Sequence, residues 1–304
     1  MTPRRTRRTV SDLSARDVLE KIALQIYKKE NEKTIPYERE LKGTLSNAQF
    51  LDGLRKAAGL GVTYGPANSC DLEHKYYTNI DIGYLPARNP CHGRNQNRFS
   101  ENAEAYCSID KIRDNGIKSS GGTCVPFRRQ NICDKNLEFL DNDHTDDTDD
   151  LLGNVLVTAK YEGESIVKNH PNKKTSDVCT ALARSFADIG DIVRGRDMFK
   201  PNTVDKVHEG LKVVFQKIYD DLKKKGINDY NDISGNYYKL REAWWTVNRD
   251  QVWRALTCGA GAKDTYFTYS KDNTQLFSNR QCGHNEGAPP TNLDYVPQFL
   301  RWFE

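Results

Sequence analysis

The sequence predicts a mainly α-helical, disulfide-stapled fold in which an irregular first subdomain precedes a helical-bundle second subdomain. Three observations support this prediction. The eight cysteines are an even number with no C-x-x-C pair, which favours disulfides over a zinc ribbon. Five of them lie in residues 70–136 among glycine, proline and asparagine, without a sustained helical period. After residue 150, four long segments carry apolar residues at helical spacing.

The composition allows substantial cores but excludes several classes of protein. The chain has 304 residues, 37% hydrophobic, and a net charge of +3. Residues 1–10 hold four arginines and no acid, whereas residues 141–150 hold six aspartates and no base. Attraction to a polyanion must therefore come from local patches. No segment has the apolar run of a secretory signal or a membrane span, and N-x-S/T sites are absent. Oxidised cysteines without a signal indicate a fragment or an unusual route of export.

The first predicted helix follows Ser14-x-x-Asp17, which resembles a capping box. Apolar residues continue at helical spacing from Val18 to Ile26, and we expect the helix to end by residue 30.

The segment GGTCVPFRRQNIC in the cysteine-rich region contains Arg128 and Arg129. Either these arginines brace the loop by bonding to nearby carbonyls and acids, or they form an exposed anion-binding loop.

The aspartate-rich run at residues 141–150 is a partial match to a calcium loop. Asp141, Asp143 and Thr145 fit the first three ligand positions of an EF-hand. However, Asp146 replaces the glycine at position six and Leu152 replaces the glutamate at position twelve. We therefore expect no calcium site and interpret the run as a solvated acidic linker between two subdomains.

The second of the four late helices has an apolar stripe from Val178 to Val193 and contains the stretch DIGDIVRGRDMF. We expect its charged residues to pair along the solvent side, at spacings of three or four: Arg184 with Asp188, and Asp191, Arg194 and Asp197 in succession. Gly190 and Gly195 predict a bend or the close approach of another backbone, because glycine weakens a helix interior.

The other late helices are predicted at residues 151–156 onward, 204–222 and 240–256. The helix at 204–222 has a single apolar stripe and ends on Lys223, Lys224 and Lys225 before Gly226, where cations and glycine both suit a helix C-terminus. These lysines are alternatively a contact for a glycosaminoglycan or a phosphate. The helix LREAWWTVNRDQVWRAL is apolar on two sides, so we expect it to be buried, with its tryptophans in the core.

Several of these segments resemble one family. DIGDIVRGRDMF, LREAWWTVNRDQVWRALTC and DYVPQFLRWFE resemble signature blocks of the alpha-type Duffy-binding-like domain in the erythrocyte membrane protein 1 adhesins of the malaria parasite. GGTCVPFRRQNIC is similar to the first cysteine-rich subdomain of that family, and residues 1–65 resemble its N-terminal segment.

The resemblance implies a mostly helical fold of three subdomains. Residues 66–150 would be the first and 151–304 the second, with the third absent from this chain. It also implies export without a conventional signal to the surface of the infected red cell, with a membrane anchor outside this chain. A disulfide between Cys179 and Cys258 follows from the family pattern. The remaining six cysteines allow fifteen pairings: Cys70, Cys91, Cys107, Cys124, Cys133 and Cys282.

An enzyme is not expected, since the six histidines are scattered and H-E-x-x-H, P-loop and G-x-S-x-G motifs are all absent. Neither a cofactor nor a metal is expected. The resemblance implies an adhesin head domain that mediates cytoadhesion or rosetting. Its partners would be host antibodies and glycosaminoglycan, carbohydrate or protein receptors on red cells or endothelium. Nucleic acid and direct membrane insertion are not expected.

A sulfated glycan such as heparan sulfate would be bound by clustered arginines and lysines through charge-assisted contacts that weaken with salt. The candidates are Arg4, Arg5, Arg7, Arg8, Arg128, Arg129, Lys168, Lys173, Lys174, Lys223, Lys224 and Lys225. The alternative function is a structural head module that positions a neighbouring receptor-binding domain and presents a variable antigenic surface.

Overall fold

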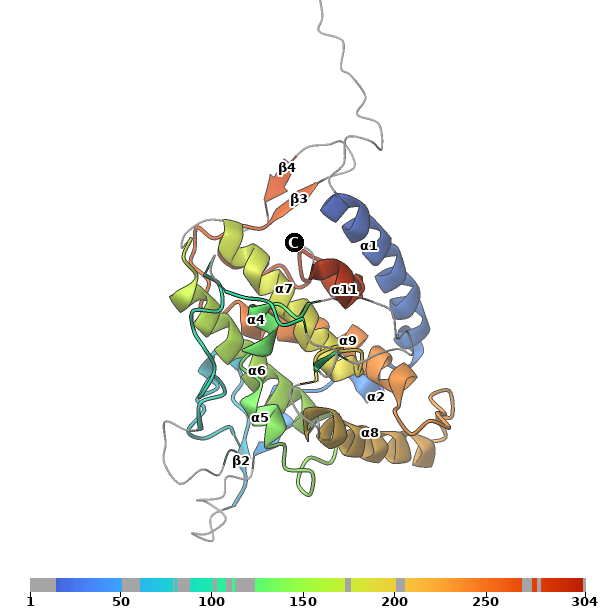
Figure 1. Ribbon diagram of the computed structural model, residues 1–304. Coiled ribbons are helices and arrows are strands. Elements are labelled where there is room, and N and C mark those ends of the chain that lie inside the picture. The colour runs from blue at the N-terminus through green and yellow to red at the C-terminus, as the bar shows by residue number, and fades with distance from the viewer. Residues whose placement is uncertain are drawn as a thin grey trace, which may run out of the picture.

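The computed structural model confirms the mainly helical, disulfide-stapled fold. It describes residues 15–50, 61–78, 80, 88–100, 103–107, 111–112, 124–172, 176–200, 206–269, 275–277 and 280–302. The four predicted late helices are all present and lie against one another (Figure 1): α6 (Thr148–Asn169), α7 (Ser176–Arg194), α8 (Lys206–Lys224) and α9 (Tyr238–Leu256).

The remaining elements are short, apart from the first helix. The helices are α1 (Ala15–Thr34), α2 (Glu38–Leu41), α4 (Phe127–Gln130), α5 (Lys135–Glu138), α10 (Arg280–Gly283) and α11 (Gln298–Arg301). The 3-10 turns are η2 (Ile35–Tyr37), η3 (Leu45–Asn47), η4 (Ser69–Asp71) and η7 (Leu293–Tyr295). Two antiparallel pairs join β1 (Gln49–Phe50) to β2 (Thr63–Tyr64), and β3 (Phe267–Tyr269) to β4 (Gln275–Phe277). The described residues between Cys70 and α5 are irregular apart from short turns and α4, as predicted.

Helix α9 is the centre of the core and packs against α1, α6 and α7. Trp244, Trp245 and Trp253 are all buried, which confirms that its tryptophans belong to the core. The crossing of α6 over α9 depends on Gly163. A Cβ atom there would lie 1.8 Å from the carbonyl oxygen of Leu256, so only glycine allows the two backbones to approach this closely.

The acidic run is not a solvated linker throughout, because it builds the start of α6. The Asp147 side chain accepts hydrogen bonds from the backbone N–H groups of Asp149 and Asp150, which is a helix N-cap. Asp150 is buried and accepts a hydrogen bond from Gln49 N at 2.8 Å, which ties β1 to α6. The expected boundary between residues 150 and 151 therefore falls inside the first turn of α6.

Most charged residues of DIGDIVRGRDMF do not face solvent, so the predicted solvent exposure is wrong, although Arg196 is exposed and the predicted pair of Asp191 with Arg194 is present at 2.9 Å. Asp188, Asp191, Arg194 and Asp197 are all buried. They lie on the side of α7 that α11 and η7 cover. A polar helix face predicts exposure only where nothing packs on it, and here the layer that packs on it carries arginines.

We name this cluster the arginine–aspartate network. Its members come from α4, α7, α9, η7 and α11: Arg128, Arg129, Asp188, Asp191, Arg194, Asp197, Glu242, Arg249, Asp294 and Arg301.

Arg301 of α11 bridges two carboxylates of α7. Its Nη2 donates to Asp188 Oδ1 at 3.0 Å and also to Asp191. Arg128 Nη1 donates to the other oxygen of Asp188 at 2.5 Å. Burial raises the pKa of Asp188, but the guanidinium groups of Arg128 and Arg301 more than offset this effect and lower it. Asp188 is therefore a charged anchor inside the protein.

Arg249 of α9 makes a bidentate pair with Asp294 of η7. Its Nε and Nη2 each donate to one carboxylate oxygen at 2.7 Å. Asp294 also accepts a hydrogen bond from Trp245 Nε1 at 2.9 Å. This pair ties the C-terminal segment to the central helix, since the two residues lie 45 positions apart.

Both glycines of the same stretch have a structural reason. Helix α7 ends at Arg194, and Gly195 follows with φ of +72°, a left-handed conformation that favours glycine. A Cβ atom at Gly190 would lie 2.8 Å from the Trp245 ring. The close neighbour of Gly190 is thus a side chain rather than the predicted backbone.

All eight cysteines are in disulfides, but the pairing of Cys179 with Cys258 is wrong. Cys179 of α7 bonds to Cys282, and Cys258 bonds to Cys70. The other bonds are Cys91–Cys133 and Cys107–Cys124. Residues 179 and 258 are both near helix ends, but the C-terminal end of α9 lies beside η4, so Cys70 is its neighbour.

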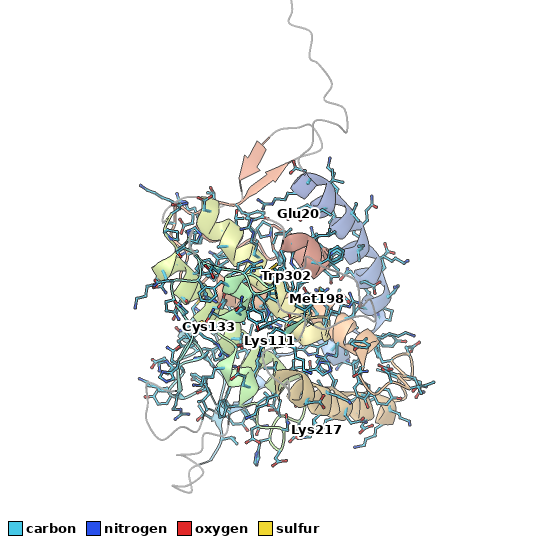
Figure 2. All side chains as sticks on the ribbon, viewed as in Figure 1. Glu20, Lys111, Cys133, Met198, Lys217 and Trp302 are labelled. Atoms are coloured by element: carbon cyan, nitrogen blue, oxygen red, sulfur yellow. A yellow bond between two sulfur atoms is a disulfide. The ribbon has the colours of Figure 1, made fainter. Side chains whose placement is uncertain are left out.

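Helix α1 is longer than predicted and is anchored near its beginning by Glu20 (Figure 2). The Glu20 carboxylate accepts hydrogen bonds from Thr291 Oγ1 at 2.6 Å, Asn292 N at 2.8 Å and Tyr266 Oη at 3.1 Å. Burial raises the pKa of Glu20, although these bonds and Arg16 oppose the effect. The contact joins residue 20 to a segment about 270 residues away.

Candidate functional site

The predicted lysine cluster lies at the C-terminal end of α8. Lys223, Lys224 and Lys225 are all exposed. Gly226 follows with φ of +84°, which confirms the predicted helix stop. Lys225 Nζ pairs with Asp221 at 2.6 Å, four residues earlier on the same helix. The cluster is therefore accessible, but one of its charges is already paired.

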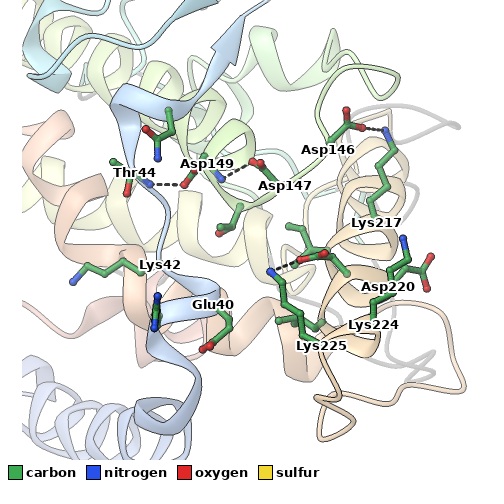
Figure 3. A pocket seen from close by; sticks show the side chains of 16 residues that line it. Glu40, Lys42, Thr44, Asp146, Asp147, Asp149, Lys217, Asp220, Lys224 and Lys225 are labelled. Carbon is green, nitrogen blue, oxygen red and sulfur yellow. Dashed lines mark hydrogen bonds and ion pairs between the residues drawn. The ribbon is translucent and has the colours of Figure 1, made fainter.

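A cavity of about 900 Å³ lies beside this cluster, between α2, the start of α6 and α8 (Figure 3). Six carboxylates line it, from Glu40, Asp146, Asp147, Asp149, Asp220 and Asp221. Five cations line it as well, from Arg39, Lys42, Lys217, Lys224 and Lys225. Because the acids outnumber the bases, the cavity itself does not attract a polyanion.

Most carboxylates of this mixed-charge cavity already have partners. Lys217 extends from α8 to Asp146 at 2.7 Å, and Asp149 accepts a hydrogen bond from Thr44 N at 2.7 Å (Figure 3). Of the five cations that line the cavity, Arg39 and Lys224 form no ion pair with any residue that the structure describes. These two side chains are the cations that an acidic group of a partner would meet here.

Arg39, Lys42 and Lys217 were not among the sequence candidates. Arg39 lies in α2, Lys42 directly follows it and Lys217 lies in α8, so only the fold brings them to one cavity. Lys217 donates to Asp146 of the acidic run at residues 141–150. The sequence shows both the lysine and the acidic run, but it does not show that they meet.

Arg128 and Arg129 are not an exposed anion-binding loop. Arg129 is buried and its guanidinium makes two hydrogen bonds to the Asp197 carboxylate, at 3.1 and 2.5 Å. Arg128 pairs with Asp188, and burial lowers its pKa although Asp188 partly opposes this. The bracing alternative is confirmed, because both arginines bond to acids of α7 and of the turn after it.

Of the other candidates, Lys168 is the one that the structure describes. Lys168 is exposed near the end of α6, on a different helix from the α8 cluster. Arg4, Arg5, Arg7, Arg8, Lys173 and Lys174 lie outside the described residues.

A second cavity, of about 770 Å³, lies between α1 and α11. Ile26, Tyr238 and Phe299 contribute to its lining and are each about two-fifths exposed. The lining also holds charged residues, among them the exposed Arg196, but its exposed apolar and aromatic side chains suit a protein surface better than a sulfated sugar.

The described residues contain no group of three or more histidine, cysteine or acidic residues arranged to hold a metal ion. Within the same residues, every helix is too short or too polar to cross a membrane.

The fold and surface define a disulfide-braced helical domain of the Duffy-binding-like type, with its charged motifs inside and scattered lysines outside. The family model of the Duffy binding domain matches residues 122–301, and that of the N-terminal segments of PfEMP1 matches residues 14–49. The chain belongs to the Duffy binding domain family, as an alpha-type domain with its N-terminal segment from the PfEMP1 adhesins.

Solved structures agree with this assignment. The NTS-DBL1α and CIDRγ double domain of PfEMP1 from the Plasmodium falciparum varO strain is 58% identical, with a TM-score of 0.89 over 95% of this chain and 42% of that one. A DBLβ domain of PfEMP1 bound to human ICAM-1 is 27% identical, with a TM-score of 0.71 over 93% of this chain and 60% of that one.

Curated relatives are more distant and much longer. The Duffy receptor of Plasmodium vivax is 26% identical over 226 residues, which are 70% of this chain and 18% of that protein. The beta form of the Duffy receptor from Plasmodium knowlesi is 26% identical over 68% of this chain and 16% of its own length. The chain thus spans less than a fifth of the length of these relatives.

Proposed function

We propose that this chain is the head domain of an adhesin on the infected red cell surface and that it binds a receptor on host cells, without catalysing a reaction. The supporting observation is its likeness, over 93% of its length, to a DBLβ domain bound to human ICAM-1. The arginine–aspartate network adds physical support. It fixes the interior through buried ion pairs, so the exterior can differ between relatives without loss of the fold.

The proposed contact is made by the outside of the domain. The family motifs DIGDIVRGRDMF and LREAWWTVNRDQVWRAL place most of their charged and aromatic groups in the interior. These buried groups therefore stabilise the fold and are not available to a receptor. A protein receptor is supported by the apolar lining of the cavity between α1 and α11.

A sulfated glycan is the second candidate, supported by the exposure of Lys223, Lys224 and Lys225. Sulfate groups form charge-assisted contacts with such lysines. The carboxylates of the neighbouring cavity oppose this attraction, so binding through this cluster would be weak and lost as salt rises.

The first experiment is a binding screen of the folded fragment against red cells, endothelial cells and a panel of purified host receptors. Saturable binding, lost after the disulfides are reduced, is the expected result. Absence of binding to every cell and receptor would favour the alternative, a head module that positions a neighbouring domain.

A heparin column then tests the glycan candidate. Replacing Lys223, Lys224 and Lys225 by alanine is expected to lower the salt concentration at which the fragment elutes. The matched control replaces Lys21, Lys28 and Lys29, three exposed lysines of α1, and removes the same charge. Equal shifts for the two triple variants would mean that only net charge matters and would contradict a site on α8.

A further inference from the structure

The four disulfides lie in different environments. Cys179 and Cys282 are both buried, and Cys133 is buried beside a half-buried Cys91. Cys70 and Cys258 are half-buried. Cys107 is the exposed cysteine of the eight, and its partner Cys124 is half-buried. Since a thiolate must reach a sulfur along the line of the S–S bond, Cys107–Cys124 is the most accessible bond for exchange.

The backbone holds this pair together independently of the sulfur bond. Tyr106 N donates to Val125 O at 2.8 Å, and Val125 N donates to Tyr106 O at 2.7 Å. Cys107 and Cys124 are the next residues of the same antiparallel pair and therefore lie directly opposite each other. Their Cα atoms are 4.1 Å apart, as expected for opposite residues whose backbones are not bonded to each other.

A second backbone bridge holds the chain just beyond Cys107. Ile112 pairs with Phe199, and Lys200 N donates to Lys111 O at 2.8 Å. Figure 2 labels Lys111 and Met198, which lie on the two segments that this bridge joins. The cysteines also lie only 17 positions apart, against 42, 103 and 188 for the other pairs. This disulfide therefore closes the shortest loop of the four, and opening it removes the smallest constraint on the chain.

We propose that Cys107–Cys124 is a thiol–disulfide exchange site, open to low-molecular-weight thiols such as glutathione or to the active-site cysteine of an extracellular oxidoreductase. This proposal is independent of receptor binding.

The exchange proceeds in two steps. An incoming thiolate attacks Cys107 Sγ, the Cys107–Cys124 bond breaks, and the electron pair leaves on Cys124 as a thiolate that takes a proton from water. A second thiolate attacks the sulfur of the bound thiol, which forms the external disulfide and releases Cys107 as a thiolate. Two external thiols are oxidised for each disulfide reduced. Because the Tyr106–Val125 bridge keeps the two thiols adjacent, exchange with an external disulfide such as oxidised glutathione, which is reduced to two thiols, restores the same bond.

The test exposes the folded chain to increasing concentrations of reduced glutathione. Free thiols are trapped with iodoacetamide, the remaining disulfides are then reduced and labelled with N-ethylmaleimide, and each cysteine is read by peptide mass spectrometry. We expect Cys107 and Cys124 to be trapped with iodoacetamide at least about tenfold faster than any other pair, with an unchanged far-ultraviolet circular dichroism spectrum. Earlier opening of another pair would overturn the proposal, as would simultaneous opening of all four with loss of helicity.

Two double variants sharpen the test. Cys107→Ser with Cys124→Ser is expected to remain helical and to lose the fast phase of thiol release. Cys70→Ser with Cys258→Ser removes the next most accessible pair and is expected to keep the fast phase. A fast phase that survives the first variant or disappears in the second would overturn the proposal, and the wild-type labelling order decides if either variant fails to fold.

Discussion

Replacing Arg249 by methionine is expected to destabilise the fold strongly. The substitution removes two hydrogen bonds to Asp294 and one to the carbonyl of Thr291. Both side chains of the pair are almost fully buried, at 4% and 0% exposure. Asp294 would keep a donor from Trp245 but no cation in its bidentate pair. Removing one partner of a buried ion pair costs about 3–5 kcal/mol, and we expect a loss of that size.

A double-mutant cycle separates the pair from the packing of its neighbours. Asp294→Asn removes the charge and retains an oxygen that can accept from Trp245. Combined with Arg249→Met, it leaves no unpaired charge, so the double variant is expected to lose only about 1–2 kcal/mol relative to wild type. Asp294→Asn alone leaves the buried Arg249 cation unpaired and also destabilises the fold, so the two single losses together are expected to exceed the loss in the double variant by at least about 2 kcal/mol, which is the coupling energy.

The assay is equilibrium unfolding in urea with the disulfides intact, followed by tryptophan fluorescence. Three buried tryptophans of α9 report directly on this part of the core. Lys225→Met is the control, because its pair with Asp221 is about half exposed and is expected to contribute less than about 0.5 kcal/mol. The reasoning is refuted if Arg249→Met costs less than about 1 kcal/mol, or if the double variant loses as much as the two single variants added together.

Three further predictions concern other contacts. Gly163→Ala would drive a Cβ atom into the carbonyl of Leu256, and we expect the free energy of unfolding in urea to fall by at least about 3 kcal/mol. Gly61→Ala is the control, because a Cβ atom at Gly61 meets open space. Glu20→Ala removes the acceptor of three hydrogen bonds that anchor α1, so we expect amide hydrogen exchange to accelerate more in α1 than in α8 relative to wild type. Burial raises the pKa of Asp150 to about 6, against opposing backbone hydrogen bonds, so protonation stabilises the fold. The free energy of unfolding of wild type, measured relative to Asp150→Asn, should rise by about 1 kcal/mol from pH 7 to pH 5. A decrease over this range would contradict the raised pKa.

Patterns of apolar residues predicted the helices well. The stripe of the third late helix, its stop at Gly226 and the burial of the α9 tryptophans follow from spacing and local chemistry alone. These features depend on residues within a few positions of each other, which a sequence displays directly.

Features that depend on distant neighbours were not accessible in the same way. Asp188 and Asp191 look like a solvated helix face until Arg301, over a hundred residues later, is placed against them. The cysteine pairing and the cavity between α2 and α8 also depend on residues that are far apart in the sequence. In each case the spacing is compatible with several neighbours, and only the packed chain selects one.

The Cys70–Cys258 bond has a mechanical consequence for a domain that is pulled by its ends. It joins residues 188 positions apart, so tension between the ends of the chain would travel through sulfur instead of through α6, α7 and α8. Unravelling that stretch would otherwise lengthen the chain by roughly 600 Å. With the bond closed, such a pull cannot extend these helices, and any surface they carry would keep its shape under load.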